Sequence, residues 1–482
     1  MSWPPRCHRG VALPELHRIG AAEDELFAEA VRYHQAGRLA EADILYRRIL
    51  ARDPCQPAIL HNLGVIARQT ENPAAAAALF RRALSLRPDY PEALGNLGIA
   101  WRDQGDHRQA AATLERAVCL QPDVAELHNN LGGVHKEQGR IDGAIREFRR
   151  ALSIQPDQPE IRCNLAAALL QRGDYGEGWR EHEWRLHRDV SWAKPRLFGQ
   201  PRWTGEDLTG RTILLHAEQG LGDGLQFARY ATPIAARGAR VILEVAPSLT
   251  ALLATVPGVA QVVAAGAALP AFDCHLPLMS APALLGTTVA TIPAEIPYIT
   301  AHAAMVAAWG RRLAHLPGPK VGLAWAGDPR PHDWRAHAVD RQRSMALTRL
   351  TPLLDLPGIS VVSLQKGVAA AQIGDIAPER RPFDPMDAVV DFADTAALVA
   401  NLDLVIAVDT AVVHLAGAIG KPAWILSRFD GCWRWLLDRE DSPWYPTARL
   451  FRQTTPGDWD AVVARLVEAL AKHGIPFKEQ EA

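Results

Sequence analysis

The 482-residue sequence has little of what marks several common protein classes. No apolar run approaches the roughly 20 residues that a membrane-spanning helix needs, and the start of the chain has no continuous apolar stretch of the signal-peptide kind. The formal net charge is only -2, so electrostatics give no reason to expect nucleic acid as a partner. The six cysteines are scattered and include no C-x-x-C pair, which argues against a disulfide scaffold or a zinc site. We therefore expect a cytoplasmic protein without a transmembrane segment.

Internal repetition dominates the first part of the chain. Proline, asparagine and glycine recur every 34 residues, and only Glu71 departs from the glycine series. The three series are Pro54, Pro88, Pro122 and Pro156; Asn62, Asn96, Asn130 and Asn164; and Gly37, Gly105, Gly139 and Gly173. This period is that of the tetratricopeptide repeat, a pair of helices joined by a turn. It predicts an α superhelix over residues 20–190, with its glycines in left-handed turn positions.

Arrays of this kind usually offer a concave groove to an extended peptide. We therefore expect a protein or peptide partner along the repeats. The four asparagines of the series are candidates to line the groove and to hydrogen-bond a peptide backbone. An equally good alternative is that they only pack between helices or cap them.

The hydrophobic period changes after the repeats. Residues 191–210 combine proline, glycine and tryptophan without periodicity, and we interpret them as a linker. Beyond them short β-rich apolar runs alternate with helical stretches, which predicts parallel sheets with crossover helices. The expected strands lie near 211–216, 240–245, 260–263, 320–327, 358–367, 403–408 and 422–427. They would form two Rossmann-like units, 211–317 and 318–475, facing a cleft where the strands end.

The first expected strand runs into the glycine-rich segment "AEQGLGDGLQFARY". Gly220, Gly222 and Gly224 allow a tight turn that a ligand can approach closely. Asp223 falls at the start of the helix expected over Asp223–Arg237. Its carboxylate could be a general base that faces the cleft, or it could be only a helix cap that satisfies free amides.

A dinucleotide site is an alternative for the same region. Glu244 ends the next expected strand, where a ribose-binding acid belongs, and a nucleotide-dependent oxidoreductase would use it. The glycines read G-x-G-x-G instead of G-x-G-x-x-G, so the match is poor. No Gly-Lys-Ser/Thr follows, which excludes Walker-type phosphate binding.

Cations gather in the segment "AGDPRPHDWRAHAVDRQRSMAL", which we expect to be a loop after the first strand of the second unit. Arginine at a strand end suits a phosphate, which its guanidinium contacts at two points. Lys366 occupies the corresponding edge one strand later, and plain solvation is an equal alternative for each of these cations. The arginines are Arg330, Arg335, Arg341 and Arg343. We expect no metal, because the nearby acids and histidines match no established ligand spacing: His332, Asp333, His337 and Asp340.

The segment "DLVIAVDTAVVHLAGAIGKP" places an acid and a threonine where a buried strand meets a helix. The free amides at the start of that helix form an anion site. Thr410 adds a hydroxyl, Asp409 can hold a sugar or ribose hydroxyl, and small residues such as Ala411 let the helix press close to the sheet. His414, one turn later, belongs either to this site or to the core. These parts describe a site for a nucleotide-diphospho-sugar.

Two motifs, "LGDGLQ" and "DTAVVHLAGAIGKPAW", resemble the signature regions of the heptosyltransferase-like glycosyltransferases. The resemblance covers roughly residues 210 to 475 and implies a GT-B fold that works without a metal and inverts the anomeric centre. It implies that Asp223 is the base, and that the Asp-Thr segment and the helix start hold the donor. The family commonly has glycine where this chain has Ala411. Arg343 is the best match to the family's phosphate-contacting basic residue.

The order of the domains, repeats before a GT-B half, resembles the protein O-GlcNAc transferases. The segment "SLQKG" is similar to their phosphate-contacting lysine segment. Only the architecture carries over, since full agreement with their motifs is absent. It implies a protein acceptor threaded along the repeats.

We therefore expect an α superhelix followed by an α/β GT-B half that acts as an inverting, metal-independent glycosyltransferase. A nucleotide-diphospho-sugar would be the donor substrate, no cofactor would be needed, and the acceptor would be a hydroxyl on a protein or glycan. Asp223 would be catalytic. The donor-binding residues would be Gly222, Arg343, Lys366, Asp409, Thr410, Ala411 and His414. A non-catalytic repeat scaffold with a degenerate α/β half is the main alternative, and the oxidoreductase is the third.

Overall fold

The computed structural model describes residues 21–188, 196–330 and 334–473. The chain divides into two compact units, residues 1–165 and 166–482. Within the described residues, none of the helices has both the length and the apolar character needed to cross a bilayer.

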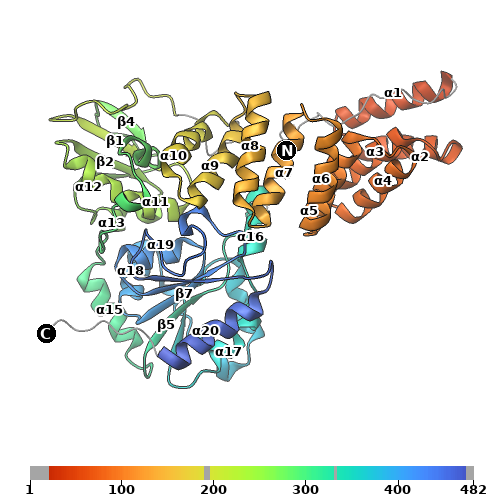
Figure 1. The fold of residues 1–482 in the computed structure, drawn as a ribbon. Helices are drawn as coiled ribbons and strands as arrows, with labels where there is room; N and C mark the ends of the chain where they lie inside the picture. Colours follow the sequence, from red (N-terminus) through yellow and green to blue (C-terminus); the bar gives the residue numbers. More distant parts are fainter. Residues whose placement is uncertain (1–20, 189–195, 331–333, 474–482) are drawn as a thin grey trace. The chain divides into compact units, whose positions relative to one another are not determined.

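The first unit consists of helix pairs stacked one after another, drawn red to orange in Figure 1. The helices are α1 (Ala21–Gln35), α2 (Leu39–Arg52), α3 (Pro57–Gln69), α4 (Pro73–Leu86), α5 (Pro91–Asp103), α6 (His107–Leu120), α7 (Ala125–Glu137), α8 (Ile141–Ile154) and the start of α9 (Pro159–Arg172). The repeat prolines lie between pairs, where they cannot continue a helix. The predicted superhelix of helical repeats is therefore confirmed.

Glycine has two separate roles in this unit. In the turns, Gly105 and Gly139 have φ of 81° and 74°, which confirms the predicted left-handed backbone. Glu71 adopts the same conformation with φ of 59° although it carries a side chain. Inside the pairs, a Cβ atom on Gly64 would lie 2.5 Å from Phe80 Cε1, so only glycine lets the two helices pack this closely.

The second unit contains two sheets whose strands are all parallel (Figure 1). The first sheet has the order β3 (Val259–Ala264), β2 (Arg240–Val245), β1 (Thr212–His216) and β4 (Cys274–Pro277). The second has the order β6 (Ser360–Ser363), β5 (Lys320–Ala324), β7 (Leu404–Val408), β8 (Ala423–Ser427) and β9 (Ala448–Arg452). Each expected strand is present, whereas β4 and β9 were not predicted. Both are edge strands, as are the predicted β3 and β6, but β4 (CHLP) and β9 (ARLFR) lack the β-branched valines by which β3 and β6 were recognised.

Two helix predictions for this unit differ from the structure. The helix expected over Asp223–Arg237 is broken by a 3₁₀ turn (Ala228–Tyr230), and the expected arginine loop contains the helix α16. The helices of the unit are α10 (Tyr175–His182), α11 (Leu221–Phe227), α12 (Ala231–Ala235), α13 (Thr250–Leu253), α14 (Ala281–Leu284), α15 (Ala303–Leu313), α16 (Trp334–Arg343), α17 (Thr351–Leu354), α18 (Phe392–Ala400), α19 (Ala411–Ala418) and α20 (Trp459–His473).

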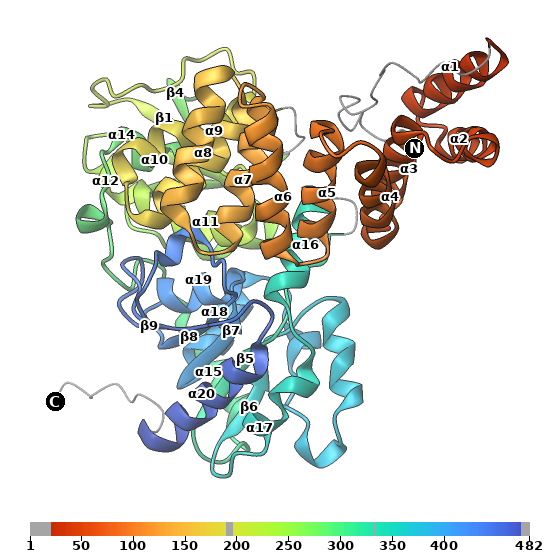
Figure 2. The same ribbon diagram turned by 45° about the vertical axis from the view of Figure 1, so that its right-hand side comes forward.

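The second sheet is covered on both faces (Figure 2). Side chains along β7 alternate: Val405 and Ala407 join the cluster that includes α18 and α19, while Leu404 and Ile406 join the one that includes α17 and α20. A strand buried on both sides reads as a continuous apolar run, which is why β7 was predictable.

The boundary between the repeats and the α/β region is not a free linker. Trp203, inside the expected linker 191–210, is buried, and its backbone N–H donates to the carbonyl of His275 in β4 (2.9 Å). Residues 189–195 lie outside the described residues. The expected repeat end at residue 190 also differs from the division inside α9, because α10 buries Trp179 against Phe227 and Trp433.

Candidate functional site

The helix α19 begins directly after the carboxyl end of β7, as the sequence predicted. Thr410 takes the N-cap position with an extended backbone (φ -137°), but its side chain caps no amide. Its Oγ1 atom is buried and has no hydrogen-bond partner among the described residues. Gly417 lets the helix sit close to its neighbours, since a Cβ there would lie 2.3 Å from Tyr445 Cδ1. The helix start thus has a hydroxyl without a partner and no side-chain cap on its first amides.

Arg343 reaches this helix start from the last turn of α16. Its Nη1 donates to the backbone carbonyl of Asp409 (3.0 Å), and its Nε donates to Asp340 Oδ1 (3.0 Å). The structure therefore brings together Arg343 and Asp409, which are far apart in sequence. Asp340, weighed as a metal ligand, is instead a buried partner of Arg343.

Asp223 lies in the first turn of α11, where both of its oxygens are engaged. Oδ2 accepts a hydrogen bond from the backbone N–H of Gly220 (2.9 Å), so the helix-cap alternative is realised. Oδ1 forms an ion pair with Arg434. The side chains of Asp223 and Arg434 remain 20% and 11% exposed, so the pair keeps partial contact with solvent.

The starts of α11 and α19 pack against each other. A Cβ atom on Gly222 would lie 2.9 Å from His414 Cδ2 and 3.4 Å from Ala411 Cα, so glycine is needed for this approach. Two sequence motifs separated by almost 190 residues therefore meet at one place. Arg330, from the segment before α16, also reaches this region, since its Nη2 would lie 3.7 Å from a Cβ on Gly220.

His414 belongs to the core, which was the alternative to a donor-binding role. Its ring stacks on Trp435 (centroids 5.5 Å apart), and its Nδ1 lies 3.0 Å from the Tyr445 hydroxyl. Burial, with Arg434 and Arg229 nearby, lowers the pKa of His414 well below its usual value. A neutral, buried imidazole positions α19 but does not supply positive charge to a phosphate.

Arg434 is the residue that sequence reasoning missed. Besides Asp223, it donates to Gln226 Oε1 and to Cys432 Sγ (3.1 Å), and its guanidinium lies 4.4 Å from the Trp433 ring centroid. Its signal in the sequence is faint: it is one of two arginines in the tryptophan-rich segment "DGCWRWLLDREDSPWYP". A pattern read along the chain could not pair it with an acid 211 positions away.

Lys366 is not joined to the α19 site. Its side chain is exposed on the loop after β6, and its Nζ donates to the carbonyl of Val389 (2.5 Å). Among the described residues no hydrogen bond or ion pair links it to Asp409, Thr410 or Arg343. The expectation that Lys366 binds the donor therefore has no support in the geometry.

Glu244, the acid of the dinucleotide alternative, is unavailable to a ribose. Its side chain is buried and forms an ion pair with Arg196. The prediction of an oxidoreductase depends on Glu244 binding a ribose, and the ion pair with Arg196 contradicts that role.

One of the four repeat asparagines is excluded from peptide binding. Asn62 is fully buried, and its Nδ2 contacts the Tyr46 hydroxyl at 3.4 Å, so it packs between helices. The other three are half-buried: Asn96, Asn130 and Asn164. Their role on the groove stays a prediction.

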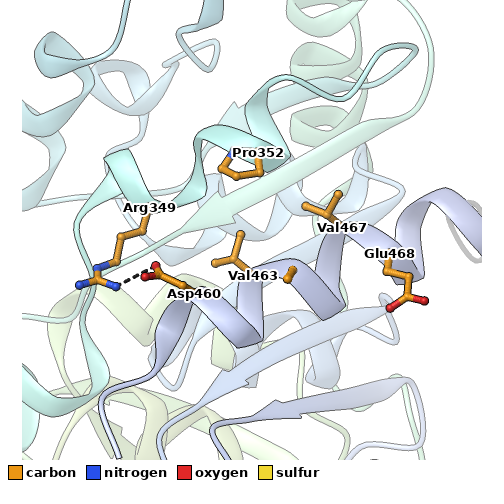
Figure 3. Close-up of a pocket in the computed structure, with 7 residues that line it drawn as sticks. Arg349, Pro352, Asp460, Val463, Val467 and Glu468 are labelled. Carbon is orange, nitrogen blue, oxygen red and sulfur yellow. Dashed lines mark hydrogen bonds and ion pairs between the residues drawn. The ribbon is translucent and has the colours of Figure 1, made fainter.

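The described residues contain no group of three acids, histidines or cysteines that could hold a metal ion. His332 and Asp333 lie outside the described residues. A hollow does exist between α17 and α20 (Figure 3), where Arg349 and Asp460 form an ion pair of 2.8 Å beside Val463. Its lining includes none of the sequence-predicted site residues.

Comparison with known proteins identifies the first part of the chain. A tetratricopeptide repeat model matches residues 27–91, 61–123, 96–159 and 135–178. The N-terminal part of roughly 180 residues therefore consists of tetratricopeptide repeats.

A curated relative extends further along the chain. Protein FlbA of Caulobacter vibrioides is 32% identical over 327 residues, which is 63% of this chain and 53% of FlbA. The chain thus spans about half the length of this relative. The region matched by FlbA is longer than the repeat array, so the similarity includes part of the α/β region.

Three similar solved structures each cover about a third of this chain. MamA is 23% identical, covers 33% of this chain and 92% of its own, and has a TM-score of 0.31. PilF of Pseudomonas aeruginosa is 21% identical, with coverage of 36% and 78% and a TM-score of 0.33. TTC0263, a tetratricopeptide protein of Thermus thermophilus, is 25% identical, with coverage of 35% and 91% and a TM-score of 0.30.

Proposed function

We propose that this chain is a glycosyltransferase of GT-B type, whose repeats recruit a protein that is the acceptor or a partner. The acceptor's hydroxyl oxygen bonds to the anomeric carbon of a nucleotide-diphospho-sugar, and the bond from that carbon to the diphosphate breaks. Asp223 takes the proton of the hydroxyl, and the nucleoside diphosphate leaves. The displacement inverts the anomeric centre.

The observation that carries the proposal is the meeting of α11 and α19. Gly222 packs on Ala411, which brings the element that carries Asp223 against the uncapped start of α19. The cap and the ion pair of Asp223 stabilise the fold, but stability alone gives no reason to leave the start of α19 uncapped. A transfer reaction needs both the carboxylate and the uncapped helix start, because one group accepts a proton while the other stabilises the leaving charge.

The leaving diphosphate would contact three kinds of donor. The amides at the start of α19 and the Thr410 hydroxyl supply neutral donors, and Arg343 supplies a cation already directed at the Asp409 carbonyl. Each hydrogen bond to a charged group contributes about 1.5–3 kcal/mol. Asp409 would hold a hydroxyl of the sugar or ribose.

A thermal-shift screen with nucleotide sugars and nucleoside diphosphates tests donor binding. Thr410→Val should weaken binding of the responding nucleotide about tenfold without loss of stability, since the Thr410 side chain caps no amide. Thr351→Val is the matched control: Thr351 begins α17, and its hydroxyl already donates to the Thr348 carbonyl (2.7 Å). Equal nucleotide affinity of the two variants would reject the α19 site.

Asp223→Asn then tests the base. Transfer should be abolished in this variant while the donor still binds, because an amide cannot accept the proton. Undiminished turnover would refute the assignment.

A non-catalytic scaffold is the second candidate. It is favoured by the engagement of both Asp223 oxygens, one by a helix amide and one by Arg434. A scaffold should respond to no nucleotide in the same screen.

A further inference from the structure

A cation lies where α11 and α19 meet, and the proposed mechanism gives it no task. Arg434 is held by three partners: Asp223, Gln226 and the Cys432 sulfur. It sits in a short 3₁₀ turn (Trp433–Trp435) whose Trp435 stacks on His414 of α19. The guanidinium is thus held beside the acid of α11, in a turn that packs on α19.

The electrostatics of Arg434 involve both sides of the site. Burial works to lower the pKa of its guanidinium, but Cys432, Asp223 and Asp409 outweigh burial and raise it. Arg434 therefore stays charged and acts on an acid of each motif. The carboxylates of Asp223 and Asp409 both interact electrostatically with the Arg434 guanidinium.

Buried hydrogen-bond donors around this cation lack an acceptor among the described residues, and one of them, Trp435 Nε1, belongs to the same 3₁₀ turn. Gln226 is fully buried, and its Nε2 makes no hydrogen bond although its Oε1 accepts from Arg434. The buried Thr410 hydroxyl is also unpartnered. Buried polar atoms are normally satisfied, and the unmatched groups here are the N–H donors of Gln226 and Trp435 together with the Thr410 hydroxyl, which can donate or accept. A ligand rich in acceptor oxygens would satisfy these groups, and a diphosphate offers acceptors only.

We infer that Arg434 is shared: it pairs with Asp223 in the free protein and moves to the diphosphate when the donor binds. A guanidinium forms its strongest contacts with phosphate oxygens, which carry more charge than one carboxylate. The transfer of Arg434 frees Asp223 Oδ1, so the base becomes available only after the donor is in place. This inference rests on the proposed donor site and adds an order of events to it.

The inference predicts that substitutions of Arg434 and of Asp223 change the affinity for a diphosphate in opposite directions. Isothermal titration of the full chain with UDP, GDP, ADP and inorganic pyrophosphate gives the affinity of the best probe. Arg434→Gln should weaken that affinity at least about tenfold, since a charged contact is lost. Asp223→Asn should strengthen it about threefold to tenfold, because the carboxylate no longer competes for Arg434.

Asp430→Asn is the matched control. Asp430 lies in the same segment but pairs with Arg428 (3.1 Å), so its loss should leave the affinity unchanged. If Arg434→Gln does not fold, Arg434→Lys keeps the charge without the planar fork, and the sign of the Asp223→Asn effect is tested independently.

Each outcome decides a separate question. Unchanged affinity in the Arg434 variant, or unchanged or weaker affinity in Asp223→Asn, overturns the sharing of Arg434 while the donor site stands. Failure of every probe to bind the wild type and both variants removes the donor site itself.

Discussion

In the repeat unit polar side chains contact residues one repeat away, whereas in the α/β unit they contact residues from distant parts of the chain. Asn96 lies 2.9 Å from His61, and Arg102 pairs with Glu137; both pairs are 35 residues apart. Arg434 and Asp223 are separated by 211 residues. Contacts at a constant spacing leave a periodic trace in the sequence, and contacts between unrelated segments leave none. The difference explains why the repeats were easy to predict and Arg434 was not.

The largest expected effect comes from an ion pair in the α/β unit. Arg185 forms two ion pairs, with Glu218 (2.8 Å) and Glu183 (2.7 Å), and is 2% exposed. Arg185→Met would leave the 7% exposed Glu218 without its cation, which costs about 3–5 kcal/mol. Hydrogen-exchange mass spectrometry should show lost protection in residues 212–230, because Glu218 precedes α11.

Arg150→Met applies the same substitution to the repeat unit. Arg150 and Asp123 form a pair that is 48% and 84% exposed, so its loss should cost at most about 1 kcal/mol. Similar losses of unfolding free energy in Arg185→Met and Arg150→Met would mean that the burial of an ion pair does not determine how much it contributes to stability.

An intermediate effect is expected from pH in the repeat unit. Burial, which is the main cause, lowers the pKa of His61 from 6.5 to about 4. The unfolded chain therefore binds the proton first, and stability is lost as the pH falls from 6.5 towards 4. Urea unfolding at pH 7 and pH 4.5 should differ by about 2–3 kcal/mol from this residue. His61→Gln should remove that part of the difference; an identical pH dependence in the variant would contradict the assignment.

The smallest effect concerns the repeat turn. Glu71 holds φ of 59° where the other repeats have glycine, so Glu71→Gly should raise stability by up to about 1 kcal/mol. Gly105→Ala is the reciprocal change: nothing lies within 4 Å of a Cβ there, so only its φ of 81° opposes the substitution. Thermal denaturation should give shifts of opposite sign, and equal signs would show that the turn conformation is not what selects glycine.

Part of the candidate site could be predicted from local sequence patterns, and the rest depended on contacts between distant segments. Asp409 and Thr410 were predictable because a buried strand and a small-residue helix are both local features. Asp223 was found at a helix start, but the partner that engages its Oδ1 was not. Lys366 was misjudged because its place at a strand end says nothing about where its side chain bonds.

Two of the four edge strands, β4 and β9, and the buried ion pairs could not be predicted from the sequence. The strand β9 (Ala448–Arg452) has arginines at both of its half-buried positions, so it lacks the apolar run by which β7 was recognised. Glu244 lies at a strand end where a ribose-binding acid is expected, but its carboxylate forms an ion pair with Arg196 from the expected linker.

The sequence by itself determined the repeat period, the left-handed turns and the central strands, because helix propensity, glycine conformation and strand burial act between near neighbours. Only the tertiary structure decided that Gly222 meets Ala411 and that Arg434 stands between two acids. Those contacts form when sheets and helices pack, and packing selects residues by shape and charge in space, not by their separation along the chain.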